Sequence, residues 1–150
     1  MRLWLDASVL VSLITREPTS RRIDDILIRQ PSPLVSDFCV TESSSAIARL
    51  VRTGARTPAQ ADDLFDHLDV WVASASDRVV VDQGDIAMAT DLVRRHDLVL
   101  RAPDAVHIAA ATRLGATILT LDRGMARAAA ALGVPYLNPA EADAPGEPKD

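Results

Sequence analysis

Short apolar segments alternate along this chain with longer segments of helical periodicity, and this alternation limits the fold more than any other feature. Strand character is carried by residues 2–5, 34–35, 79–81, 117–121 and 134–137, which are rich in Leu, Ile and Val. Strands that alternate with helices form a parallel sheet covered on both faces. The sequence therefore predicts an α/β fold, a three-layer sandwich with a central parallel sheet of about five strands flanked by about seven helices.

Helix start and stop signals support this interpretation. Ser8 can cap a helix over residues 9–15, and Thr57 with Gln60 forms a capping box behind Pro58. The predicted helices begin near residues 9, 20, 37, 58, 85, 103 and 123. Glycines that can adopt a left-handed conformation end three of them, at Gly54, Gly115 and Gly133.

Length and composition indicate one domain. The 150 residues match the usual size of a single domain, which we place at residues 1–138. Residues 139–150 are rich in Pro, Ala and acids and are expected to form a flexible tail. Cys39, the only cysteine, favours a reducing compartment. Asp6 interrupts the first apolar run too early for a signal peptide, and no run reaches the roughly 18 apolar residues of a membrane span. We expect a soluble cytoplasmic protein.

The net charge of −5 disfavours a general nucleic-acid binder. That balance depends on a few residues, because the chain is nearly neutral once Asp6, Glu42, Asp104 and Asp122 are set aside. All of the 16 basic residues except Lys149 are arginines, which bind phosphate in a bidentate manner. A compositional bias of the genome explains the arginines equally well, so both interpretations stay open.

The same four acids all lie at or near the ends of predicted strands or the beginnings of predicted helices. Asp6 and Asp122 come directly after predicted strands, Asp104 opens a helix, and Glu42 lies early in another helix. The carboxyl ends of parallel strands share one edge of a sheet, so the four can meet there. Clustered carboxylates repel one another unless a cation neutralises them, and Mg²⁺ accepts such oxygen ligands. The pattern predicts a metal site for phosphodiester cleavage. An internal ion pair between an arginine and Asp6 or Asp104 would contradict it.

Each residue also has an ordinary structural role. Asp104 could be a first-turn helix acid, and Glu42 alone is typical of a solvated helix residue. Ser8 is mainly a helix cap, with a supporting role at a metal-held water as the alternative. His107, on the helical face of Asp104, is more typical of a structural histidine.

Taken together, the motifs resemble the PIN-domain family, in particular VapC-type toxins of toxin–antitoxin pairs. The resemblance covers the chain from Leu3 to about Pro139. It rests on Leu5-Asp6-Ala7-Ser8-Val9-Leu10, Val40-Thr41-Glu42, Leu100-Arg101-Ala102-Pro103-Asp104-Ala105-Val106-His107-Ile108-Ala109-Ala110-Ala111 and Ile118-Leu119-Thr120-Leu121-Asp122-Arg123. Each motif alone is weak, whereas the ordered set is specific.

The resemblance implies a Mg²⁺- or Mn²⁺-dependent endoribonuclease that acts on structured RNA. Asp6 and Asp104 would be direct metal ligands, and Asp122 and Glu42 would complete the catalytic shell directly or through water. It further implies a homodimer that a cognate antitoxin holds inactive. Because only five aromatic residues are present, RNA recognition would rely on arginines. The candidates for RNA binding are Arg94, Arg95, Arg101, Arg123 and Arg127.

Other folds with strand-end acids fit less well. A haloacid-dehalogenase-like phosphatase needs a second Asp where Ser8 stands, and a response-regulator receiver domain needs a lysine that this chain has only in its tail. A P-loop NTPase and a dinucleotide-binding domain lack their Gly-rich loops here. The non-enzyme alternative is a catalytically silent PIN-like module that only docks a partner protein.

Overall fold

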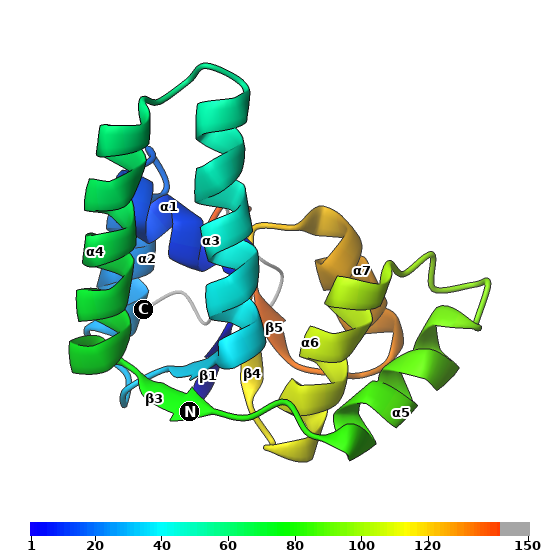
Figure 1. The fold of residues 1–150 in the computed structure, drawn as a ribbon. Helices are drawn as coiled ribbons and strands as arrows, with labels where there is room; N and C mark the ends of the chain where they lie inside the picture. The colour runs from blue at the N-terminus through cyan, green and yellow to red at the C-terminus, as the bar shows by residue number, and fades with distance from the viewer. Residues whose placement is uncertain (142–150) are drawn as a thin grey trace.

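A five-stranded parallel sheet with the order β3-β2-β1-β4-β5 runs through the middle of the molecule (Figure 1). The computed structural model describes residues 1–141. The strands are β1 (Leu3–Leu5), β2 (Leu34–Ser36), β3 (Asp77–Val79), β4 (Thr117–Leu119) and β5 (Tyr136–Leu137). The helices are α1 (Ala7–Thr15), α2 (Ser20–Leu27), α3 (Asp37–Arg52), α4 (Pro58–Ala75), α5 (Gln83–Val93), α6 (Ala102–Arg113) and α7 (Arg123–Ala131). The predicted α/β architecture is confirmed.

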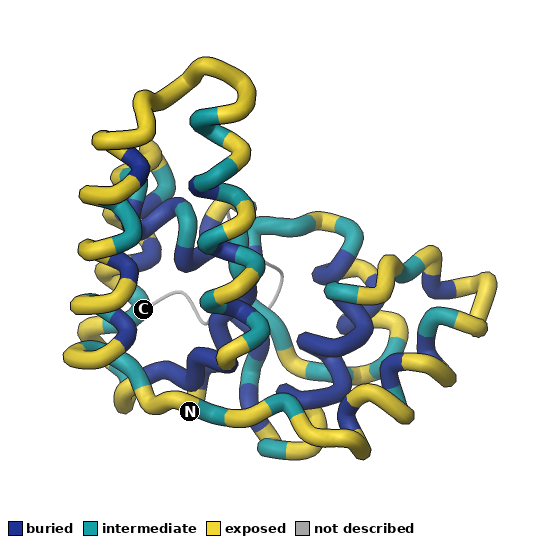
Figure 2. Tube along the Cα trace, in the orientation of Figure 1, coloured by how far each residue is buried: buried dark blue, intermediate teal, exposed yellow. Residues whose placement is uncertain are grey.

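Each face of the sheet has its own apolar core, because neighbouring strand residues point to opposite faces. Trp4 and Ile118 pack with α5, α6 and α7, whereas Leu3, Leu5 and Leu119 pack with α1 to α4. Helix α6 is buried from Asp104 to Ala111, and its many alanines let it lie close to the sheet. Figure 2 shows this burial along α6 and the exposed outer surface of α4.

The two central strands bring distant parts of the sequence together. β1 pairs with β2 on one side and with β4 on the other, with Leu5 opposite Leu119. The chain therefore extends the sheet from β1 first in one direction and later in the other. This is a topological switch point, where ligands bind at the carboxyl ends of the strands in α/β sheets.

Three strands have an end that differs from the sequence prediction by two residues, and pairing explains two of these differences. β2 ends at Ser36, opposite Val79, where α3 begins, so Val80 and Val81 have no strand to pair with. The strand over residues 79–81 was thus predicted too late, since β3 covers Asp77–Val79. β4 likewise ends at Leu119, because its neighbour β1 ends at Leu5 and the chain turns into α1. The strand predicted over residues 134–137 is reduced to Tyr136–Leu137.

Helix ends agree with the sequence signals at most positions. The Thr57–Gln60 capping box is present, and Gly54, Gly115 and Gly133 all have positive φ angles just past helix ends. The predicted cap of the first helix is wrong. Asp6, not Ser8, is the N-cap of α1, because its carboxylate accepts a hydrogen bond from the backbone N–H of Val9.

The predicted flexible tail lies mostly outside the described residues. Of residues 139–150, only 139–141 are described, and Asn138 accepts a hydrogen bond from Ala140 N–H through its side chain. Residues 142–150 lie outside the described part of the chain. Within residues 1–141, no helix combines the length and apolarity needed to cross a membrane.

Val99 carries backbone strain in the segment that leads into α6. Its φ angle is +51°, and its side chain is 84% exposed. A left-handed conformation costs about 1–2 kcal/mol for a residue with a Cβ, and branching at Cβ adds to the crowding. We expect Val99→Gly to raise the free energy of unfolding by about 1 kcal/mol. Urea titration followed by circular dichroism measures this.

Val80→Gly is the matched control, because Val80 is 68% exposed and has no positive φ angle. There glycine should lower the free energy of unfolding by about 0.5–1 kcal/mol through the entropy of the unfolded chain. A loss of stability in both variants would show that Val99 is not strained.

Candidate active site

Four carboxylates line one small cavity at the carboxyl edge of the sheet. Asp6 follows β1, Glu42 lies on α3, Asp104 lies in the first turn of α6, and Asp122 precedes α7. The cavity has a volume of about 150 Å³, and Ser8, Arg101 and His107 also reach it. Residues separated by more than a hundred positions thus share one space because the ends of β1 and β4 are neighbours.

Asp6 is the most firmly held of the four. Its Oδ1 accepts hydrogen bonds from Val9 N–H (3.1 Å) and Ser8 Oγ (2.6 Å), and its Oδ2 accepts one from Thr120 Oγ1 (2.5 Å). The residue is only 3% exposed. Three donors fix the direction of both oxygens, so this carboxylate is preorganised before any ligand arrives.

Two hydroxyl groups connect Asp6 to the segment after β4. Ser8 Oγ accepts from Leu121 N–H (2.9 Å), and Thr120 Oγ1 accepts from Asp122 N–H (2.9 Å). Each hydroxyl then donates to Asp6. The sequence motifs did not indicate Thr120, because its contact with Asp6 joins residues 114 positions apart. Ser8 supports the carboxylate of Asp6 and does not cap α1.

An arginine crosses the mouth of the cavity and contacts two of the acids. Arg101 donates to Asp104 Oδ2 through Nε (3.4 Å) and to Asp122 Oδ2 through a terminal nitrogen (3.3 Å). Asp122 Oδ1 also caps α7 by accepting from Met125 N–H (2.8 Å). The Arg101 side chain is 74% exposed, although that of Asp104 is only 12% exposed, and both contacts are long. They are not the internal ion pair that would contradict a metal site.

Burial makes negative charge costly in this cavity. It raises the pKa of Asp6 above its ordinary value, although the hydrogen bonds from Ser8 and Thr120 oppose the shift. Burial also raises the pKa of Asp104, and repulsion from Asp122 raises it further against the attraction of Arg101. A nearby cation would therefore stabilise the ionised form of both carboxylates.

Glu42 is oriented by a buried chain of side chains. The Trp4 indole N–H donates to His107 Nδ1 (2.9 Å), and His107 Nε2 lies 2.5 Å from Glu42 Oε1. An indole N–H can only donate, so Nδ1 must be the acceptor. The proton of the neutral imidazole is then on Nε2, which donates to Glu42. His107 is thus buried between Trp4 and Glu42 and holds a carboxylate of the cavity.

The donor set suits a hard divalent cation. Among residues 1–141, no three carboxylate, imidazole or thiol groups are arranged as a ready ligand cluster for one ion. Mg²⁺ needs only one or two direct carboxylates, however, because it keeps several waters. Four carboxylate side chains around one cavity, two with raised pKa values, fit that requirement.

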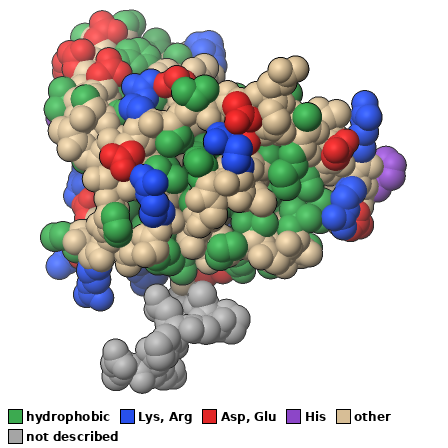
Figure 3. Space-filling view, turned by 90° about the horizontal axis from the view of Figure 1, so that it is seen from below, with side chains coloured by type: hydrophobic (Ala, Val, Ile, Leu, Met, Phe, Trp, Pro, Cys, Tyr) green, Lys and Arg blue, Asp and Glu red, His purple; other side chains and the backbone are tan. Residues whose placement is uncertain are grey.

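The predicted RNA-binding arginines are spread out. Of the five, only Arg101 lines the carboxylate cavity. Arg94 and Arg95 follow α5, where Arg95 pairs with Asp97, and Arg123 and Arg127 lie on the first half of α7. On the face seen from below, basic and acidic side chains are interspersed and no broad field of one charge appears (Figure 3).

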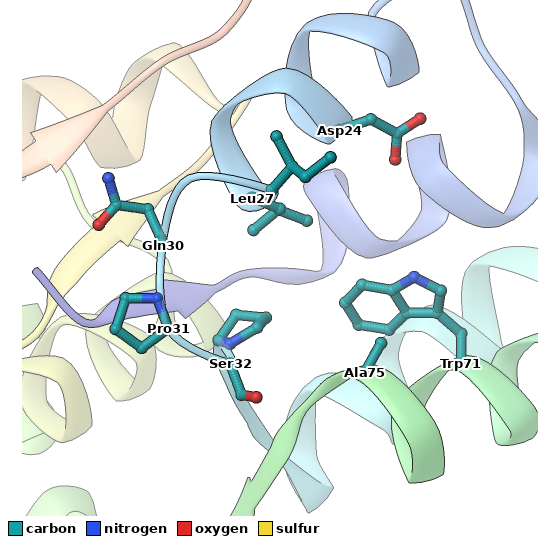
Figure 4. Close-up of a pocket in the computed structure, with 9 residues that line it drawn as sticks. Asp24, Leu27, Gln30, Pro31, Ser32, Trp71 and Ala75 are labelled. Atoms are coloured by element: carbon teal, nitrogen blue, oxygen red, sulfur yellow. The ribbon is translucent and has the colours of Figure 1, made fainter.

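A second hollow lies between α2 and α4, away from the carboxylates (Figure 4). It has a volume of about 470 Å³ and is lined mainly by apolar side chains, among them Leu27, Pro31 and Trp71. Within the described part of the chain, Asp24 is the only ionisable residue that lines it, and it pairs with Arg16. The hollow lacks convergent ionisable groups, so we assign the chemistry to the carboxylate cavity.

Comparison with known proteins gives the family. The PIN-domain family model matches residues 3–131, which include all four carboxylates. The chain belongs to the PIN-domain family. No curated protein sequence matches this PIN domain.

Solved structures share the fold of this PIN domain. FitAcB from Neisseria gonorrhoeae is 21% identical, with a TM-score of 0.72 over 91% of this chain and 97% of that one. VapC20 from Mycobacterium tuberculosis, a toxin that cleaves the sarcin–ricin loop, is 15% identical, with a TM-score of 0.66 over 84% and 94%. A toxin–antitoxin complex from Klebsiella pneumoniae is 17% identical, with a TM-score of 0.67 over 95% and 100%.

The raised pKa of Asp104 predicts how stability depends on pH without metal. A carboxyl with a raised folded pKa binds protons more readily when folded, so its ionisation reduces stability as pH rises through that pKa. In EDTA at neutral pH, Asp104→Asn should therefore leave the free energy of unfolding unchanged or slightly higher. Any gain should shrink as the pH falls toward 3.8, the ordinary value of this carboxyl. Urea titrations at several pH values test this, and a large loss in EDTA would make Asp104 a structural residue.

The contact between Trp4 and His107 predicts one tautomer. In ¹⁵N NMR spectra, His107 should show an unprotonated Nδ1 and a protonated Nε2. Trp4→Phe removes the indole donor, and we expect it to lower the free energy of unfolding by about 1–3 kcal/mol and to weaken this preference. Trp71→Phe is the control, because no hydrogen bond from the Trp71 indole is found in residues 1–141. A protonated Nδ1 in the wild type would contradict the assigned chain.

Proposed function

We propose that this PIN domain is a Mg²⁺- or Mn²⁺-dependent endoribonuclease and the toxin of a toxin–antitoxin pair. The observation that carries the proposal is the single cavity in which Asp6, Glu42, Asp104 and Asp122 meet. Family membership agrees with it, and so does the fold shared with toxins such as VapC20.

Three of the four carboxylates would bind the cation. Asp6 and Asp104 would hold the ion, because both are buried and burial raises their pKa values, which a bound cation would oppose. Asp122 would complete the shell, since it lines the cavity and its Oδ2 accepts from Arg101. When bound, a divalent cation supplies electrophilic activation of a phosphodiester and lowers the pKa of water.

Glu42 and the hydroxyl groups would orient these ligands. His107 holds Glu42 Oε1, which leaves Oε2 for a water molecule or the ion. Ser8 and Thr120 keep the Asp6 oxygens in place, as second-layer hydrogen bonds do around metal ligands. Arg101, exposed at the mouth, can contact a substrate phosphate in a bidentate manner.

The proposal includes partners and a compartment. A cognate antitoxin would hold the enzyme inactive, and the active form would be a homodimer in the cytoplasm. The structural neighbours include toxin–antitoxin complexes, which supports the antitoxin. The alternative is a catalytically silent module that only docks a protein.

Cleavage of RNA by the purified protein tests the proposal. Mg²⁺ or Mn²⁺ should support cleavage, EDTA should stop it, and Asp6→Asn should reduce it at least about 100-fold. Asp69→Asn, which changes an exposed acid on α4, should retain full activity. Circular dichroism verifies folding, and Asp104→Asn gives a second test if Asp6→Asn fails to fold, because Asp6 also caps α1.

Metal binding can be measured separately from cleavage, through the melting temperature. Mg²⁺ should raise the melting temperature of the wild type more than that of Asp104→Asn, since the ion stabilises only the state that binds it. RNA cleavage that persists in EDTA would refute the metal mechanism. A folded protein with no cleavage under any of these ions would favour the silent module.

A further inference from the structure

A groove leads away from the carboxylate cavity along one side of α3. It has a volume of about 760 Å³, and most of its lining comes from α3 between Glu42 and Thr53. It shares Ala7, Glu42 and Arg101 with the cavity. The groove and the cavity therefore lie next to each other, so a ligand held in the groove has one end beside the carboxylates.

Helical spacing explains which residues face the groove. Positions three, four and seven residues apart lie on one side of a helix, and Glu42, Ser45, Arg49 and Arg52 follow that spacing. At 1.5 Å per residue, the stripe from Glu42 to Arg52 is about 15 Å long. In Figure 1 the second half of α3 extends beyond the sheet beside α4, so the arginine end of the stripe lies on a projecting part of the molecule.

The charge along this stripe changes sign. Glu42 marks the acidic end, and the exposed Arg49 and Arg52 mark the other end. Within residues 1–141, neither arginine forms an ion pair, although several arginines outside the groove do not either. Two like charges three residues apart on a helix repel slightly, so an anion between them is favoured.

We propose that this groove binds the sugar–phosphate backbone of a single RNA strand and leads it to the carboxylates. The inference rests on the proposed function, because it takes RNA as the substrate. Arg49 and Arg52 would contact consecutive phosphates, and Arg101 would contact the phosphate nearest the cavity. An acidic peptide would also match the arginines, but it has no bond to present to a cation-loaded cavity. The position of the groove directly beside the cavity therefore favours RNA.

Among residues 1–141, no aromatic side chain lines the groove, which indicates how the strand is recognised. Without stacking platforms, binding depends on phosphate charge and varies little with base sequence. Its affinity should therefore fall steeply as salt concentration rises.

The test compares the wild type with a double variant that carries both Arg49→Ala and Arg52→Ala. Its probe is a fluorescent single-stranded RNA of mixed sequence, and binding is measured by anisotropy in EDTA at several salt concentrations. We expect affinity at low salt to fall about ten-fold or more and the salt slope to decrease by about 1.4, since each phosphate contact in a single strand contributes about 0.7. In cleavage assays with Mn²⁺, KM should rise while kcat is retained.

The control double variant is Arg21→Ala with Arg29→Ala, which removes the same charge from exposed residues outside the groove. It should keep the wild-type affinity and slope. Equal losses in both double variants, or none in either, would overturn the groove assignment. The groove assignment would also be overturned if the variant lacking Arg49 and Arg52 kept its RNA binding but lost binding of an acidic antitoxin peptide. If the wild type binds RNA through these arginines but cuts none, the groove stands and the proposed nuclease function fails.

Discussion

The architecture of the site depends on the hydrogen bonds that the buried carboxylate of Asp6 accepts. It caps α1 at the end of β1, and through Ser8 and Thr120 it also holds the segment that follows β4. These hydrogen bonds begin where the ladder between β1 and β4 stops at Leu5 and Leu119. Side-chain hydroxyls thus replace the sheet ladder at the edge where the cavity opens, and the backbone N–H groups of Leu121 and Asp122 remain satisfied.

The same arrangement stores unfavourable electrostatic energy. A fold that buries Asp6 and brings Asp104 close to Asp122 raises the pKa values of both buried acids. Proteins tolerate such local costs when the surrounding core is large, and here two apolar cores cover the two faces of the sheet. The cavity is therefore well ordered and short of positive charge, which is the state a cation site needs before it binds.

The sequence predicted the fold because its signals are local and repeated. Apolar runs, caps and glycines identified every strand and helix, and errors arose where pairing decides, as at Val80 and Val81, which look like a strand but have no partner. The four acids could be placed at one edge because strand ends converge in a parallel sheet. Thr120 and the chain from Trp4 to Glu42 depend on contacts between residues about a hundred positions apart, which no local pattern carries.

The positions of the arginines relative to the site were likewise not predictable from local sequence. Of the five candidates chosen for their nearness to the acidic edge, two follow α5 and two lie on α7, and only Arg101 lines the cavity. Arg49 and Arg52 are far from any acidic motif, yet α3 carries them along the groove that begins at Glu42. Arg101 belongs to both spaces. Under the proposed function, a cation that neutralises Asp104 and Asp122 also weakens their attraction for Arg101. The exposed guanidinium is then available to a phosphate at the junction of cavity and groove.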